Sequence, residues 1–249
     1  MKPRIKKVVI GILIAAVSLT VVGNVLRFVT EGDRSKNDAL PPFITANPLD
    51  LSQIKSISQF RSCEGHNFSG YNANGEKETY RTMKHYVESI DELAQTDQQV
   101  KIFAPFDGKI SQIVKDPRGS RVYLSPTSKS SGWDFLFFHV DLLPKFNNEG
   151  TKIVSGDHIG FANLTNAANF DIALRNIGLG KQLNDSPFFY MTEEVLSQYS
   201  SVGVAIEDII ISKEKRDTSP CQLAPGQSGR DAFYARSEAG KSWINLERE

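Results

Sequence analysis

Cysteine is scarce in this sequence. The 249 residues contain two cysteines, Cys63 and Cys221. They do not form a Cys-x-x-Cys pair, which argues against the common cysteine-based zinc sites. In an exported chain, an isolated pair predicts one disulfide. Its closure of a long loop would be worth roughly 3–5 kcal/mol, because the crosslink restricts the unfolded chain.

The sequence also lacks an excess of charge of either sign. Lysine plus arginine and aspartate plus glutamate each number 29, so the formal net charge is zero. Proteins that bind nucleic acid usually carry a basic surface, and this balance predicts no nucleic-acid partner. Four of the basic residues lie within the first seven positions, which leaves the rest of the chain slightly acidic.

Uncharged apolar sequence is concentrated near the N-terminus, where Val8–Gly23 contains no charged residue and apolar residues continue to Val29. A basic flank before such a run is typical of a signal or anchor segment, and about 20 residues span the bilayer core as a helix. We predict a membrane anchor over residues 1–30, a linker over 31–58, and a single-pass protein whose C-terminal domain lies outside the cytoplasm. The alternative is a cleaved signal peptide and a secreted product.

The middle of the chain has short β-rich runs separated by proline, glycine and aspartate turns. Their near-regular spacing predicts a mainly β domain, a small sandwich or barrel with a few short helices, within residues 59–249. We expect helices over Glu78–Leu93 and from Ser186 to about Tyr199, and a closing strand over Trp243–Leu246. The β-rich runs are Val100–Ala104, Lys109–Val114, Arg121–Leu124, Trp133–Phe138, Lys152–Val154, His158–Ala162 and Phe170–Leu174.

Two motifs carry a resemblance to known families. Ala104–Ile110 has the sequence Ala-Pro-Phe-Asp-Gly-Lys-Ile, and Val154–Gly160 has Val-Ser-Gly-Asp-His-Ile-Gly. Together they resemble the flattened β-sandwich of lipoyl and biotinyl carriers and the related fold of zinc endopeptidases of the lysostaphin and LytM type. The carrier interpretation is weak, because His85 follows Met83-Lys84 where the biotinyl motif has a second methionine.

The peptidase resemblance covers roughly residues 60–175. Gly65-His66 resembles the start of the family's His-x-x-x-Asp motif, and Phe138-His139-Val140 occupies the place of its Tyr-x-His-Leu strand. Asn169-Phe170-Asp171-Ile172 occupies the place of its His-x-His-Phe strand. The resemblance therefore implies a duplicated hybrid motif fold, a barrel-sandwich hybrid, for this domain.

The same resemblance implies a degraded zinc site. The family binds zinc through its first histidine, the aspartate four residues later and the second histidine of His-x-His. Here His66 remains, but Gly70 stands at the second position and Asp171 at the third, while Asn169 replaces the expected base. We therefore predict a pseudoenzyme that needs no cofactor and acts as a binding or regulatory module of the cell envelope.

An alternative is an active zinc endopeptidase or hydrolase with a rebuilt ligand set. His66, His85 and Asp171 would hold the metal, and His139 would assist catalysis. In the binding-module interpretation, a groove would take a glycan or peptide of the cell wall or surface, or an envelope protein. Its predicted lining is His66, His139, Asp171, Arg175 and Tyr80. A purely structural role at the cell surface is the third hypothesis.

Overall fold

The computed structural model describes residues 41–94, 100–127, 132–165, 167, 169–178, 181–235 and 242–248. The predicted membrane anchor, residues 1–30, lies outside this part of the chain. Among the described residues, no helix is both long enough and apolar enough to cross a membrane.

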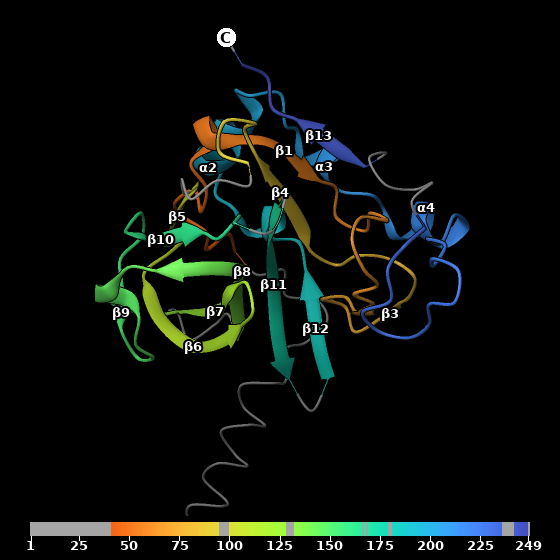
Figure 1. The fold of residues 1–249 in the computed structure, drawn as a ribbon, viewed down its shortest axis with the longest axis horizontal. Coiled ribbons are helices and arrows are strands. Elements are labelled where there is room, and N and C mark those ends of the chain that lie inside the picture. The colour runs from red at the N-terminus through yellow and green to blue at the C-terminus, as the bar shows by residue number, and fades with distance from the viewer. Residues whose placement is uncertain are drawn as a thin grey trace, which may run out of the picture.

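One mixed sheet contains the thirteen strands of the described chain, so the fold is mainly β as predicted (Figure 1). Along its main path the strand order is β13-β1-β4-β11-β8-β7-β6-β9. Off this path, β10 pairs with β5 and β8, and β12 pairs with β11 and β2. The pairing of β2 with β12 is parallel, whereas β8 pairs antiparallel with β7, β10 and β11.

The elements are short, and the helices lie mostly in the last quarter of the chain. The strands are β1 Ile54–Ser58, β2 Gly70–Tyr71, β3 Lys77–Glu78, β4 His85–Ser89, β5 Val100–Phe103, β6 Gly108–Asp116, β7 Gly119–Pro126, β8 Trp133–Leu142, β9 Lys152–Ile153, β10 His158–Ala162, β11 Asn169–Gly178, β12 Lys181–Asp185 and β13 Trp243–Asn245. The helices are the 3-10 turns η1 Leu51–Gln53, η2 Pro144–Phe146 and η3 Pro187–Tyr190, and the α-helices α2 Glu193–Ser200, α3 Ile206–Ile209 and α4 Lys213–Thr218.

Strand β8 has apolar side chains on both of its faces. Phe135 and Phe137 are fully buried in the main core, while Leu136 and Phe138 belong to a second, smaller apolar cluster. Successive side chains of a strand point to opposite sides of the sheet, which explains the division. We call the side of β4, β11, β8 and β7 that carries the second cluster the site face.

The domain begins earlier than predicted. Residues 41–58, assigned to the linker 31–58, belong to the fold. Ile44, Ile54 and Ile57 are fully buried in the main core, and β1 pairs with β4 and β13. This boundary is difficult to predict from the sequence. The segment before residue 41 is polar, and three isolated apolar residues after it show no clear strand or helix periodicity.

The helix predicted over Glu78–Leu93 is wrong. Its first residue ends β3, and its centre forms β4, which is hydrogen-bonded on one side to β1 and on the other to β11. Tertiary pairing outweighs the weak helical periodicity of this segment. The closing strand β13 is present and pairs with β1.

The helix predicted from Ser186 to Tyr199 is split into two. The Ser186 hydroxyl accepts a hydrogen bond from the Phe188 amide and caps η3. Met191 is extended, and Thr192 then caps α2. Both starts follow ordinary capping chemistry, in which a side-chain oxygen binds an unpaired amide of the first turn.

Cys63 and Cys221 form the predicted disulfide, with 5.4 Å between their Cα atoms. It joins the loop after β1 to the segment after α4. Arg216 of α4 donates hydrogen bonds to the Arg61 carbonyl and to the Cys63 sulfur. An antiparallel bridge between Phe233 and His66 also attaches the C-terminal segment to the loop that carries His66.

Candidate functional site

The site is built on three neighbouring strands. Tyr86 of β4, Asp171 of β11 and Phe138 of β8 lie directly opposite one another in the sheet. Lys84 immediately precedes β4, two residues before Tyr86, and its side chain reaches Asp171. The two residues are 2% and 1% exposed and form a buried ion pair.

The ammonium group of Lys84 has four further neighbours. Its Nζ lies 3.2 Å from Nε2 of His66. It also lies over the rings of Phe68, Tyr86 and Phe138, at 5.5, 4.7 and 4.8 Å from their centroids. Aromatic faces attract cations, and the attraction grows when water is excluded. The site is therefore a cation pocket whose cation belongs to the chain itself.

His66 is held as a neutral ring. Burial, and then the charge of Lys84, lower the pKa of His66 to about 4. Because Nε2 accepts from the Lys84 ammonium, the ring proton lies on Nδ1, which is 3.4 Å from Asp231 Oδ1. Gly65 has φ +64°, and an added Cβ would lie 2.1 Å from the Tyr86 hydroxyl. Glycine is therefore required for the loop to bring His66 this close to β4.

His139 reaches the same face through a bulge. Its φ is 61°, and the β7–β8 register shifts between Ser120 and Val122. Its Nε2 lies 2.7 Å from Arg118 Nη2, and its Nδ1 lies 3.5 Å from Asp116 Oδ1. Burial lowers the pKa of His139, against the opposing charge of Asp171. Like His66, it has a basic group at Nε2 and a carboxylate near Nδ1.

His85 does not join these residues. Its neighbour Tyr86 lies opposite Asp171, and His85 points to the other side of the sheet, where its ring packs against Phe188. Its Nδ1 lies 2.7 Å from the Ser58 carbonyl and its Nε2 lies 2.7 Å from the Ser186 hydroxyl. Both ring nitrogens are used in the core, so His85 is a structural residue and not a partner of His66.

The residues present do not fit a zinc ion. Structural and catalytic zinc sites need at least three protein ligands at about 2.0–2.2 Å. Of the predicted set, His66 and Asp171 are on one face, where His66 Nε2 and Asp171 Oδ2 both accept hydrogen bonds from Lys84. Among the described residues, no group of three or more histidine, cysteine or carboxylate side chains is placed to hold a metal.

Arg175 lies on the site face, on the same strand as Asp171 and four residues after it. Its Nη1 is 3.3 Å from the hydroxyl oxygen of Tyr123, and Nη1 of Arg121 is 3.4 Å from the same oxygen. Arg175 also stacks over the Tyr123 ring, and Arg121 over Phe138. The arginines thus continue the site away from Lys84.

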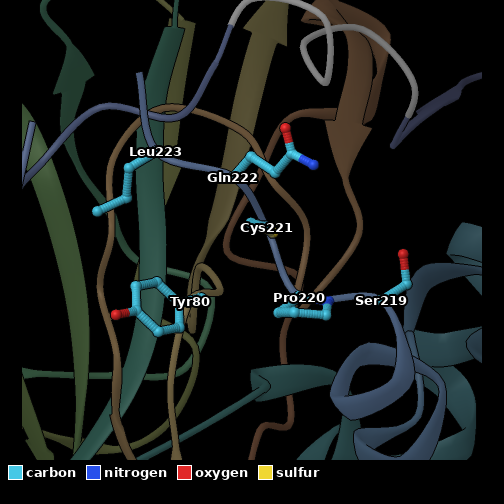
Figure 2. A pocket seen from close by; sticks show the side chains of 6 residues that line it. All are labelled: Tyr80, Ser219, Pro220, Cys221, Gln222 and Leu223. Atoms are coloured by element: carbon cyan, nitrogen blue, oxygen red, sulfur yellow. The ribbon is translucent and has the colours of Figure 1, made fainter. Parts of the chain in front are cut away.

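Tyr80 lies elsewhere. It lines an open surface pocket of about 600 Å³ with the five residues of the segment 219–223 (Figure 2). Its carbonyl accepts a hydrogen bond from the Cys221 amide. The lining includes no carboxylate, histidine, lysine or arginine, so we assign this pocket no chemistry. The predicted groove combined Tyr80 with His66, His139, Asp171 and Arg175. In the structure these five residues do not form one site.

Three basic residues that shape the site were not predicted from the sequence: Lys84, Arg118 and Arg121. Lys84 is 87 positions from Asp171, and no motif connects them. The one available signal was alternation, since Lys84 and Tyr86 share a face only if the segment is a strand. Arg118 follows a β-turn aspartate and gave no signal at all.

Comparison of the chain with models of known protein families and with curated proteins gives no match. The resemblance to zinc endopeptidases therefore depends on the motifs quoted above. The structure adds an arrangement that those motifs did not contain, namely a lysine ammonium bound between His66 and Asp171.

Proposed function

We propose that this chain is a membrane-anchored, extracytoplasmic domain of the lysostaphin/LytM peptidase type that has lost metal catalysis. It acts as a binding or regulatory module of the cell envelope. Its β-sheet domain corresponds to the flattened sandwich of that family, and residues 1–30 anchor it. The observation that carries the proposal is the position of the Lys84 ammonium.

In the resemblance, His66 and Asp171 stand at two positions where the family has zinc ligands. Here both side chains bind Lys84 instead. A zinc ion between them would have to displace an ammonium group that is also surrounded by three aromatic rings. The zinc ion would then lie close to the displaced positive charge of Lys84. It would also have only two protein ligands, one fewer than zinc sites use. The internal cation preserves the charge balance of the site without an exchangeable metal.

The alternative, a zinc hydrolase with a rebuilt ligand set, makes an opposite prediction about metal content. The full chain is purified in nonionic detergent, exposed to zinc, desalted and analysed by mass spectrometry. We expect far less than one zinc per chain, with no change in His66→Ala. His158→Ala serves as a control for the loss of a histidine elsewhere. About one zinc per chain that is lost in His66→Ala, but retained in His158→Ala, would overturn the proposal.

The envelope location has a separate test. Protease added to spheroplasts, from which the outer layers of the envelope have been removed, should digest the domain if it lies outside the cytoplasmic membrane, while a cytoplasmic marker stays intact. Protection of the domain until the spheroplasts are lysed would place it in the cytoplasm and contradict the proposal.

A further inference from the structure

Two arginines converge on one hydroxyl group. Arg121 of β7 and Arg175 of β11 lie on strands separated by β8, yet both place Nη1 within 3.4 Å of the Tyr123 hydroxyl oxygen. Two positive charges so close together repel each other, and a nearby anion offsets this repulsion. The arrangement therefore favours the binding of a negative charge.

The described chain supplies little of that charge. Neither guanidinium forms an ion pair with a carboxylate of the described residues, although Arg61 and Arg81 do so elsewhere. Asp134 lies opposite Arg175 in the β8–β11 pairing and interacts with its charge, but the two form no ion pair, and the Asp134 carboxylate accepts a hydrogen bond from Ser125 at 2.5 Å. Asp171 is paired with Lys84.

Both guanidinium groups are held in place by stacking. Arg175 lies 4.3 Å above the centroid of Tyr123, and Arg121 lies 5.4 Å from that of Phe138. Within the described residues, the Nε atoms of both arginines are buried without a hydrogen-bond partner. Stacked guanidinium groups lose little side-chain entropy when they bind, because their orientation is already restricted.

We propose that Arg121, Arg175 and the Tyr123 hydroxyl bind an oxyanion, the carboxylate or phosphate group of a ligand. This inference rests on the proposed binding function and specifies its ligand chemistry. The Tyr123 oxygen accepts from both arginines, which leaves its own O–H free to donate. Each guanidinium retains further N–H donors, and arginine binds carboxylate and phosphate through paired hydrogen bonds.

The test uses the full chain in nonionic detergent, with inorganic phosphate and acetate as probes. Each probe is titrated against chloride at equal ionic strength, and the thermal unfolding midpoint is followed. Binding to the folded state raises this midpoint as the probe concentration increases. We expect at least one probe to raise it above the chloride value, and the apparent affinity to be roughly tenfold weaker in Arg175→Gln, because the charge-assisted hydrogen bonds from this guanidinium to the anion are lost.

Tyr123→Phe is the more conservative variant, because it keeps the ring beneath Arg175 and removes only the hydroxyl. It should also weaken the effect of the probe. Lys145→Gln is the matched control: it removes one positive charge that stacks on Phe146, a residue of the main core. This control should respond to the probe as the wild type does.

A response to phosphate alone assigns the site to phosphate-bearing ligands, and a response to acetate alone assigns it to carboxylates. No response beyond chloride, or an equal response in wild type, Arg175→Gln and Tyr123→Phe, would overturn the inference. Such a failure leaves the proposed non-catalytic function standing if His66-dependent zinc is also absent. Zinc bound through His66 would remove that function whatever the anion result.

Discussion

The Lys84 ammonium and the His66 ring form a hydrogen bond of 3.2 Å in which the lysine donates to Nε2. This contact, with the Asp171 carboxylate on the other side, connects a loop, the residue before β4 and the first part of β11. The buried charge of Lys84 is therefore balanced within the site. Substitutions of these residues should change the stability of the domain as well as the site, and the change in stability can be measured.

Removal of the lysine charge alone should destabilise the domain strongly. Lys84→Met keeps an apolar chain of similar length but leaves Asp171 buried without its cation. Breaking a buried ion pair from one side typically costs about 3–5 kcal/mol of unfolding free energy. Urea unfolding followed by the fluorescence of Trp133 and Trp243 measures this loss.

The double variant Lys84→Met/Asp171→Asn is the control for that prediction. It removes both charges, so it should recover a large part of the lost stability, because no unpaired charge remains. If the losses of Lys84→Met and Asp171→Asn simply add, the two groups do not interact as the structure indicates.

A second buried charge network should behave in the same way. Glu78 is 1% exposed and accepts two hydrogen bonds of 2.7 Å from Arg61 and one of 3.1 Å from Arg81. Glu78→Gln leaves Arg61 buried without a counter-ion and leaves Arg81 with only the part-exposed Asp217, so we expect a loss of about 3–5 kcal/mol in unfolding free energy.

Asp217 provides a matched control for Glu78. It also binds Arg81, but its side chain is 43% exposed. Solvent screens such a pair, so Asp217→Asn should cost less than about 1 kcal/mol. Equal losses in Glu78→Gln and Asp217→Asn would show that burial does not determine the strength of these contacts. Both variants are compared by urea unfolding under the same conditions.

The stability of the domain should fall as the pH is lowered from 6.5 to 4. Burial lowers the pKa of His85 to about 4, and burial with the charge of Lys84 lowers that of His66 to about 4. In this range the unfolded chain binds protons that the folded chain does not, so each histidine reduces stability by up to about 1.4 kcal/mol per pH unit. Burial raises the pKa of Asp185 to about 6, which acts in the opposite direction.

His85→Asn isolates one of these contributions. The asparagine amide can still donate to the Ser58 carbonyl, but it does not titrate. Unfolding midpoints in urea, measured at several pH values between 4 and 6.5, should depend less on pH in this variant than in the wild type. The same slope in both proteins would show that His85 is not protonated on unfolding.

The sequence predicted the β-rich character of the domain well, because β-branched and aromatic runs between turn residues are a local signal. The resemblance, through the order of three motifs, also predicted one site for His66, His139 and Asp171. In the structure, Lys84 binds both His66 and Asp171, while the polar partners of His139 are Arg118 and Asp116. The sequence-based prediction failed for the segment from Glu78 to Leu93. A strand there is stabilised by β1 and β11, which lie far away in the sequence, so its own periodicity was a poor guide.

The sequence by itself determined the mainly β class and the disulfide. For the disulfide, two cysteines permit only one intramolecular pair. Only the tertiary structure decided which basic residues enter the site and which histidine leaves it. A shift of one position along β4 exchanges the two faces of the sheet, so register alone sends Lys84 toward Asp171 and His85 into the core. That register is set by hydrogen bonds between strands more than eighty residues apart, which no local pattern contains.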